Sequence, residues 1–300
     1  MAWSVHANMS NFSIDIYGDY AGMCKNRLIE AGYPCPATDK DEIVLSYLNV
    51  LRRRVPARPR KVHRRSYVVP PALVQGHTEF MAAVARGDDL RPYQSTRLTD
   101  ANFNDGMLDD FGIQHFHLGV GPHPKLPGFK NRTGDVLLAM VHPNDFYAIG
   151  VFGHGIWSDW DLLDSIYADW PKLLEPFEVK GVHGLAHRIS KADYAELRKN
   201  GINSFTQRPD GKFHMGPGMG ITSAKGSAAV SLQLNDILYQ CDHITDEIAK
   251  ALALAAGAGE AVYPAWMRLA ANGGQPVVYS ADGAKVFQVD SRLAPASLIG

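Results

Sequence analysis

The sequence is poor in cysteine: three residues, Cys24, Cys35 and Cys241, are spread over 300 positions and their number is odd. None forms a Cys-x-x-Cys pair, so neither a disulfide framework nor a cysteine-ligated zinc site is supported. No apolar run reaches the roughly 20 residues that a membrane-spanning helix needs. The first residues also lack the basic start and continuous apolar stretch of a secretory signal. We therefore expect a soluble, cytoplasmic protein that does not associate with membranes.

Several catalytic and cofactor-binding motifs are missing as well. The chain has no Gly-x-Ser-x-Gly element for nucleophilic catalysis, and its Gly-rich stretch MGPGMGITSAKG, residues 215–226, lacks both the Gly-Lys-Ser/Thr ending of a P-loop and the dinucleotide-binding spacing. We expect no cofactor and no resident metal. Two interpretations of this stretch remain open: a flexible loop, or a phosphate contact through Thr222 and Ser223 beside a following helix.

Positive charge is concentrated in one segment although the formal net charge is only -1. The segment 51–65 carries eight basic residues, Arg52, Arg53, Arg54, Arg58, Arg60, Lys61, Arg64 and Arg65. Its two prolines disfavour a continuous helix. Such a basic arm suits a polyanion, and we expect RNA phosphates to contact Arg58, Arg60, Lys61, Arg64 and Arg65. The alternative is a solvated, charged connector.

The hydrophobic pattern changes its period along the chain. Helical spacing with capping residues predicts helices over residues 17–33, 38–54, 70–87, 157–174, 190–201 and 228–257. Three strand-length apolar runs lie between them, at 111–120, 135–142 and 146–154, and predict a three-stranded antiparallel meander. Asp-Gly pairs at 210–211 and 282–283 predict hairpin turns. A further short helix is expected before the last hairpin, and residues 88–108 are expected to form a long surface connection.

This order of elements predicts an α+β fold, because the regular β-α-β alternation of a doubly wound sheet is absent. We expect a helical N-terminal region with the basic arm over 1–66, and an α+β catalytic domain with a small twisted antiparallel sheet packed on helices over 67–245. A C-terminal helix and hairpin extension would follow over 246–300.

Two histidines lie on alternate positions of the first predicted strand. In GIQHFHLG the two-residue period of a strand sends His115 and His117 to one face, about 7 Å apart along the strand. Arg132 precedes the second predicted strand and His154 ends the third. If the strands pair in sequence order, all four side chains meet near one end of the sheet.

Histidine and arginine in this number suit acid–base chemistry on a phosphodiester. One imidazole can take the proton of a 2′-hydroxyl, a second can protonate the departing 5′-oxygen, and Arg132 can hold the phosphate. The order of His115 and His117 in these roles stays open, with His154 as a third member. A zinc or iron site formed by the three histidines is a second interpretation. A non-catalytic module that binds a partner protein is a third.

The chain also resembles known proteins in four stretches, YLNVLRRRVPARPRKVH, NDGMLDDFGIQHFHLG, RTGDVLLAMV and FYAIGVFGHGIW. Over roughly residues 43–245 it resembles a group of uncharacterised bacterial and phage-associated proteins. Its central layout is similar to compact ribonuclease toxins of the barnase, EndoU, colicin and RelE-like class. That resemblance implies RNA cleavage without metal by His115, His117, Arg132 and His154. It also implies RNA, tRNA included, as substrate and an antitoxin or immunity protein as partner; the oligomeric state stays open.

Overall fold

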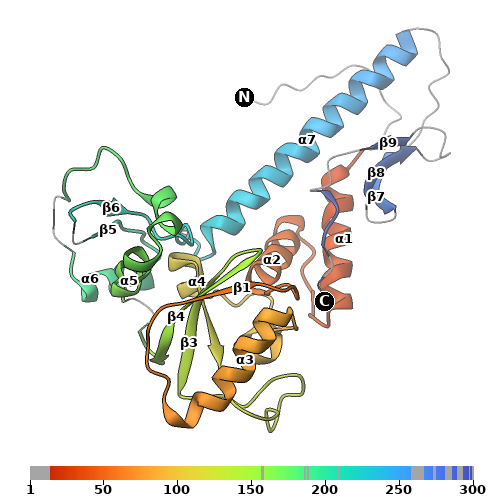
Figure 1. The fold of residues 1–300 in the computed structure, drawn as a ribbon. Helices are drawn as coiled ribbons and strands as arrows, with labels where there is room; N and C mark the ends of the chain where they lie inside the picture. Colours follow the sequence, from red (N-terminus) through yellow and green to blue (C-terminus); the bar gives the residue numbers. More distant parts are fainter. Residues whose placement is uncertain are drawn as a thin grey trace. The chain divides into compact units, whose positions relative to one another are not determined.

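The computed structural model describes residues 14–156, 159–185, 187, 189–208, 210–257, 267–272, 275–280, 286–288, 293–296 and 298. The chain divides into two compact units (Figure 1), one formed by residues 1–48 with 232–299 and the other by residues 49–231. This division differs from the three consecutive segments expected from the sequence, since the two ends of the chain belong to one unit.

The first unit combines helices with a small antiparallel sheet. Helix α1 (Ile16–Glu30) begins at Asp15, whose carboxylate accepts a hydrogen bond from the backbone N–H of Gly18. The unit also holds the start of α2 (Lys40–Arg53), most of α7 (Ala228–Gly257) and strands β7 (Met267–Asn272), β8 (Gln275–Ser280) and β9 (Val286–Gln288). The pairing of β8 with β9 confirms the last hairpin, and its Asp-Gly turn lies outside the described residues. The short helix expected before it is wrong, because residues 267–272 pair with β8 as a strand.

None of the helices in the described part of the chain is long and apolar enough to cross a membrane. Helix α7 reaches 30 residues. Charged residues such as Asp236, Asp242 and Lys250 interrupt its apolar positions.

The second unit is built on a four-stranded sheet of β1 (Lys61–Arg64), β2 (Ile113–His117), β3 (Asp135–Val141) and β4 (Asp145–Gly153) in the order β1-β4-β3-β2. The antiparallel meander β2-β3-β4 confirms the sequence prediction. The expectation of a purely antiparallel sheet is wrong, since β1 pairs in parallel with β4. Part of the predicted basic arm is therefore a strand. The reason is that Val62 packs against the hydrophobic core and draws the segment onto the sheet edge.

Four helices accompany this sheet: α3 (Val74–Arg86), α4 (Gly106–Phe111), α5 (Asp161–Asp169) and α6 (Lys191–Lys199). The fold is thus α+β, as predicted. Helix α6 begins with a capping box between Ser190 and Asp193. Strands β5 (Thr206–Gln207) and β6 (Phe213–His214) form the hairpin expected at the Asp210–Gly211 pair. Helix α4 was not expected, because its six residues are too few to show a helical period.

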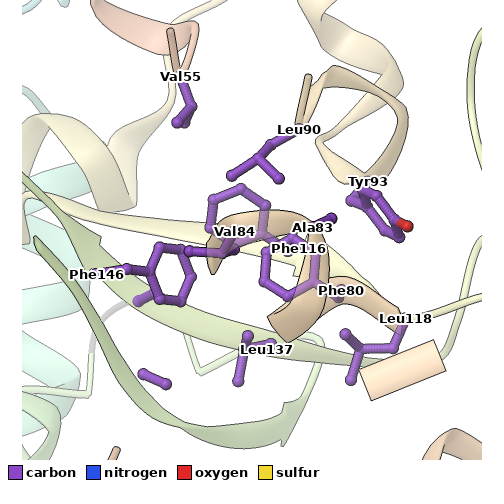
Figure 2. Close-up of a cluster of buried hydrophobic side chains, with 12 residues drawn as sticks. Val55, Phe80, Ala83, Val84, Leu90, Tyr93, Phe116, Leu118, Leu137 and Phe146 are labelled. Atoms are coloured by element: carbon purple, nitrogen blue, oxygen red, sulfur yellow. The ribbon is translucent and has the colours of Figure 1, made fainter. Parts of the chain in front are cut away.

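Each face of the sheet is covered by a separate hydrophobic core. Figure 2 shows the first, in which helix α3 packs its Phe80 and Val84 side chains against Phe116 and Phe146 of the sheet. The second core lies on the opposite face and joins Ile113, Val136 and Leu138 to residues of α4, α5 and α6. Because β2 alternates between the two faces, Phe116 enters the first core while His115 and His117 share the face of Ile113.

We predict that Phe80→Ala lowers the free energy of unfolding by about 3–5 kcal/mol, the usual cost of removing a fully buried Phe side chain. Phe80 is completely buried and contacts the rings of Tyr93, Phe116 and Phe146. Chemical denaturation of the variant measures the effect. Val74→Ala on the same helix serves as control, because Val74 is half exposed and should change stability by well under 1 kcal/mol. Equal losses for the two variants would contradict this packing.

Candidate functional site

The second unit contains a large cavity at one end of the sheet. Its volume is about 870 Å³, and the side chains of His115, His117, Arg132 and His154 all line it. The four residues singled out in the sequence, which come from three different strands and the turns beside them, are therefore brought together. The cavity is also lined by Ser95, Phe103, Asn104, Asp105, Gly106, Met107, Asp109, Thr133, Gly134, Ala195, Arg198, Lys199, Ile221 and Lys225.

The register of the strands explains why these four side chains lie at one end of the sheet. His117, the last residue of β2, is paired with Val136 of β3, and Asp135 is paired with Gly153 at the end of β4. The end of β2, the start of β3 and the end of β4 consequently lie at the same edge of the sheet. His154 directly follows Gly153.

A glycine after β2 allows the chain that carries Arg132 to approach this edge. A Cβ atom on Gly119 would lie 2.0 Å from the carbonyl oxygen of Asn131, which is closer than real Cβ atoms come. Any larger residue at position 119 would push Asn131 away. Arg132 would then move away from the histidines.

The three imidazole rings form a compact group. The ring centroids of His117 and His154 are 5.2 Å apart, those of His115 and His117 are 6.0 Å apart, and those of His115 and His154 are 6.3 Å apart. A phosphate group bound between them could contact more than one ring.

The tautomer of His117 follows from its backbone partner. The N–H of Thr133 donates a hydrogen bond of 3.0 Å to Nδ1 of His117, so Nδ1 carries no proton and the neutral ring is protonated at Nε2. Burial, followed by the Arg132 guanidinium and the two other imidazoles, lowers the pKa of His117 to about 3. At neutral pH, His117 is a neutral hydrogen-bond donor through Nε2.

His154 has the opposite tautomer. Its Nδ1 lies 2.6 Å from the carbonyl oxygen of Gly134, and because a carbonyl can only accept, Nδ1 must carry the proton. The neutral ring then has its basic lone pair on Nε2. His154 is exposed in the cavity wall, whereas His117 is buried. The site thus combines a ring that donates with a ring that can accept a proton.

His115 lies beside a carboxylate that the sequence reading missed. Nδ1 of His115 is 3.9 Å from Oδ2 of Asp105, and both side chains are largely buried. Burial lowers the pKa of His115, while the negative charge of Asp105 acts against this and favours the protonated ring. Asp105 caps α4 by accepting a hydrogen bond from the N–H of Leu108. An Asp ahead of a short apolar run is a capping pattern, and it was the available signal for both the helix and the carboxylate.

Arg132 contributes a fixed positive charge. Its Nη1 donates to the carbonyl oxygen of Gln94 over 2.6 Å, which holds the guanidinium at the cavity wall. Burial lowers the pKa of Arg132 to about 10, so the guanidinium stays protonated at neutral pH. An anion is the ligand that would best compensate this partly desolvated charge.

The Gly-rich loop carries Thr222 and Ser223, for which the sequence left a phosphate contact open. The loop packs on α4, where the N–H groups of Gly218 and Gly220 donate to the carbonyls of Asp110 and Asp109. A Cβ on Gly218 would lie 2.2 Å from the carbonyl of Leu108, which explains this glycine by packing. The Thr222 hydroxyl is used inside a turn with Gly226. Neither Thr222 nor Ser223 lines the cavity, but their neighbours Ile221 and Lys225 do.

The basic arm does not reach the cavity either. Strand β1 lies at the sheet edge opposite to β2, so Lys61 and Arg64 are three strands away from His115 and His117, and neither lines the cavity. Arg60 is buried and donates to the backbone carbonyls of His142, Arg58 and Pro56, while Arg65 forms an ion pair with Asp169. The guanidinium of Arg60 thus donates within the fold, and its contact with an RNA phosphate stays a prediction. Arg58 is likewise absent from the cavity wall.

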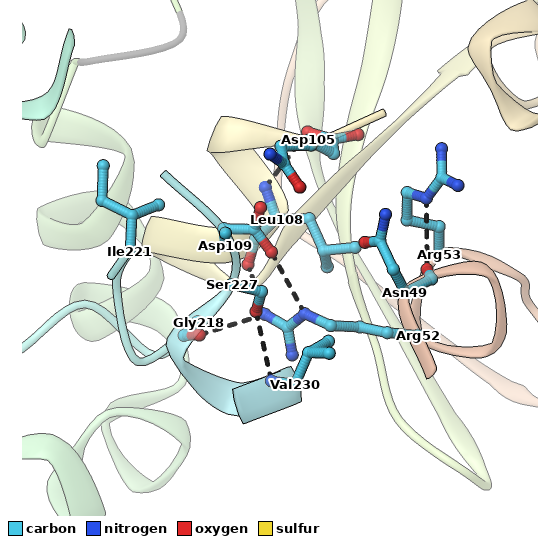
Figure 3. A network of polar contacts seen from close by, with 12 residues as sticks. Asn49, Arg52, Arg53, Asp105, Leu108, Asp109, Gly218, Ile221, Ser227 and Val230 are labelled. Carbon is cyan, nitrogen blue, oxygen red and sulfur yellow. Dashed lines mark hydrogen bonds and ion pairs between the residues drawn. The ribbon is translucent and has the colours of Figure 1, made fainter. Parts of the chain in front are cut away.

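Arg52 and Arg53 have structural roles. Arg53 is buried and donates to the carbonyls of Asn49, Arg97, Asp100 and Ala101. Figure 3 shows Arg52 between α4 and the Gly-rich loop, where it pairs with Asp109 and donates to the carbonyls of Leu108 and Gly218. Arg52 thereby fixes the helix that carries Asp105.

The metal site that the sequence left open is not formed in the described part of the chain. There, no three His, Cys, Asp or Glu side chains are grouped so that they could hold a metal ion. The three histidines instead line the cavity together with the Arg132 guanidinium.

Comparisons with protein-family models, curated proteins and solved structures find no match to this chain. The resemblance to ribonuclease toxins therefore stays a prediction, and the case for a function depends on the site itself.

Acid should destabilise the fold through His117. Because the folded-state pKa of about 3 lies below the ordinary value of 6.5, the unfolded chain binds one more proton between these values. The free energy of unfolding then falls as pH drops from 6.5, by up to about 1.4 kcal/mol per pH unit. His117→Asn removes this contribution, while its amide oxygen can still accept from Thr133. We expect denaturation between pH 7 and pH 4 to show a smaller acid-induced loss for the variant. An unchanged slope would contradict the buried neutral imidazole.

Proposed function

We propose that this protein is a metal-independent endoribonuclease that acts in the cytoplasm and leaves a 2′,3′-cyclic phosphate. The observation that carries the proposal is the pair of opposite tautomers in one cavity: His117 donates through Nε2 and His154 can accept through Nε2, with Arg132 beside them. RNA suits such a site because its 2′-hydroxyl supplies the nucleophile, so the protein has only to move protons and stabilise charge.

The two tautomers suggest which side chain accepts a proton and which donates a hydrogen bond during cleavage. Nε2 of His154 takes the proton of the 2′-hydroxyl as the 2′-oxygen attacks phosphorus. Nε2–H of His117 and the Arg132 guanidinium donate to the non-bridging oxygens as negative charge builds on them. The bond from phosphorus to the 5′-oxygen breaks, and the leaving oxygen takes a proton from His115. This order makes His154 the base. From the sequence, the base was expected to be either His115 or His117.

His115 must be protonated to act as the acid, although burial lowers its pKa. Two negative groups favour the charged ring: Asp105 at 3.9 Å, and the phosphodiester itself once it is bound. His115 therefore becomes protonated, and able to act as the acid, once the substrate is bound. RNA, tRNA included, is the proposed substrate, and an antitoxin or immunity protein stays a predicted partner.

The test is incubation of the purified protein with total RNA and with tRNA in the presence of EDTA, followed by analysis of the fragment ends. We expect defined fragments ending in cyclic phosphate. His154→Asn should reduce the cleavage rate roughly 10²-fold or more, as loss of a general base does. Its amide nitrogen can replace Nδ1–H as donor to Gly134, so the melting temperature should stay close to that of the wild type.

A matched control is His123→Asn. His123 lies outside the cavity, and its Nδ1 accepts from the N–H groups of Lys125 and Leu126, a role that the amide oxygen of Asn can take. This variant should cleave RNA at the wild-type rate. Cleavage that survives His154→Asn, or cleavage that EDTA abolishes, would overturn the proposed mechanism.

A further inference from the structure

A short turn between the hairpin β5–β6 and helix α7 carries a lysine, Lys225, that lines the same cavity as the histidines. Residues 221–227 are tied together by the bridge of Ile221 with Ser227 and by hydrogen bonds from the N–H of Thr222 to Gly226 and from the N–H of Lys225 to Thr222. The carbonyl of Lys225 also accepts from the side chain of Asn104. The backbone of Lys225 is thus fixed while its side chain is exposed and lines the cavity.

The backbone conformation of Lys225 is unfavourable for a lysine. Its φ angle is 62°, in the left-handed region that favours glycine, and Met219 is the other described non-glycine residue with positive φ. Glycine would adopt this conformation without strain. A lysine in this conformation costs stability, which a role of its side chain in binding would explain.

Helix α6 brings a second lysine to the same wall. Lys199, the last residue of α6, is exposed and lines the cavity beside Arg198. Arg198 is engaged in the fold, since it pairs with Asp110, donates to the carbonyl of Gly106 and lies over the ring of Phe111. Lys199 forms an exposed ion pair of 3.6 Å with Glu196, which is weak. Lys199 and Lys225 are therefore cations that a ligand can recruit in addition to Arg132.

The cavity wall that carries these lysines also has apolar side chains that suit a nucleobase. Phe103 and Ile221 line the cavity and are partly exposed. A volume of about 870 Å³ is near the upper end of the 300–1,000 Å³ typical of small-molecule sites. It exceeds what one phosphate needs and is too small for a duplex, so a base that enters must be unpaired.

We propose that this wall is a flanking subsite for single-stranded RNA. Lys225 and Lys199 bind the phosphate next to the one that is cleaved, and the base between the two phosphates packs on Phe103 and Ile221. The inference rests on the proposed function and narrows its substrate to RNA with at least two consecutive phosphates.

Binding of non-cleavable 2′-deoxy ligands tests the subsite separately from catalysis. The dinucleoside monophosphate d(TpA) is compared with the same ligand carrying an added 5′-phosphate or an added 3′-phosphate, by calorimetry at fixed salt. We expect one of the added phosphates to tighten binding to the wild type by about tenfold, as a charge-assisted contact does. Lys225→Met should reduce this gain to less than about twofold without changing the affinity for d(TpA). Lys199→Met should reduce it partly.

Lys172→Met is the matched control, because Lys172 is exposed in the same unit and does not line the cavity. It should keep the full gain from the added phosphate. Lys225→Gly distinguishes a role of Lys225 in binding from a role in folding, because it removes the side chain and the backbone strain at the same time. We expect its melting temperature to rise by about 2–4 °C while the phosphate gain is lost.

The outcomes distinguish the two proposals. An equal gain in wild type and Lys225→Met, or no gain in the wild type, overturns the subsite even if RNA is cleaved. A gain that depends on Lys225 supports the subsite, and if RNA is then not cleaved, only the ribonuclease proposal fails. A fall in melting temperature for Lys225→Gly would show that Lys225 supports the fold, which also contradicts the inference.

Discussion

The site depends on two backbone groups in one turn. Thr133 offers its N–H to His117 and Gly134 offers its carbonyl to His154, so adjacent residues set opposite tautomers in two neighbouring rings. A backbone amide can only donate and a carbonyl can only accept, so these assignments do not change with small movements of the side chains. Strand register places the turn between the rings, because β3 begins at the edge where β2 and β4 end.

Desolvation then decides the charge state of the site. His117 is buried and His115 is largely buried, so the pKa values of both are lowered and the two rings are neutral before a ligand binds. Arg132, Arg198, Lys199 and Lys225 supply positive charge to the cavity wall. An anion that enters the cavity is attracted by these positive charges. Its own negative charge then favours protonation of His115 beside Asp105. Binding and activation of the acid are thus coupled by electrostatics.

Arginines that look alike in the sequence have different roles in the fold. Arg52, Arg53 and Arg60 donate mainly to backbone carbonyls, where the five N–H groups of a guanidinium can satisfy several buried acceptors at once. Arg132 keeps one such contact and still faces a cavity. In the sequence, this cluster of basic residues indicated polyanion binding. In the fold, several of these residues instead donate hydrogen bonds within the protein.

Local pattern was enough for the α+β class, the β2-β3-β4 meander, the long helices and the shared face of His115 and His117, because each follows from residue spacing and nearest-neighbour pairing. The meander also brought Arg132 and His154 within reach of that face. Spacing did not reveal β1, whose partner is about 80 residues away along the chain, nor α4, whose capping Asp105 meets His115. Lys225 was missed for the same reason: its turn reaches the cavity through Asn104, from a distant part of the chain. Such contacts arise only when the core has packed, since their free energy depends on burial and on neighbours that the local sequence does not contain.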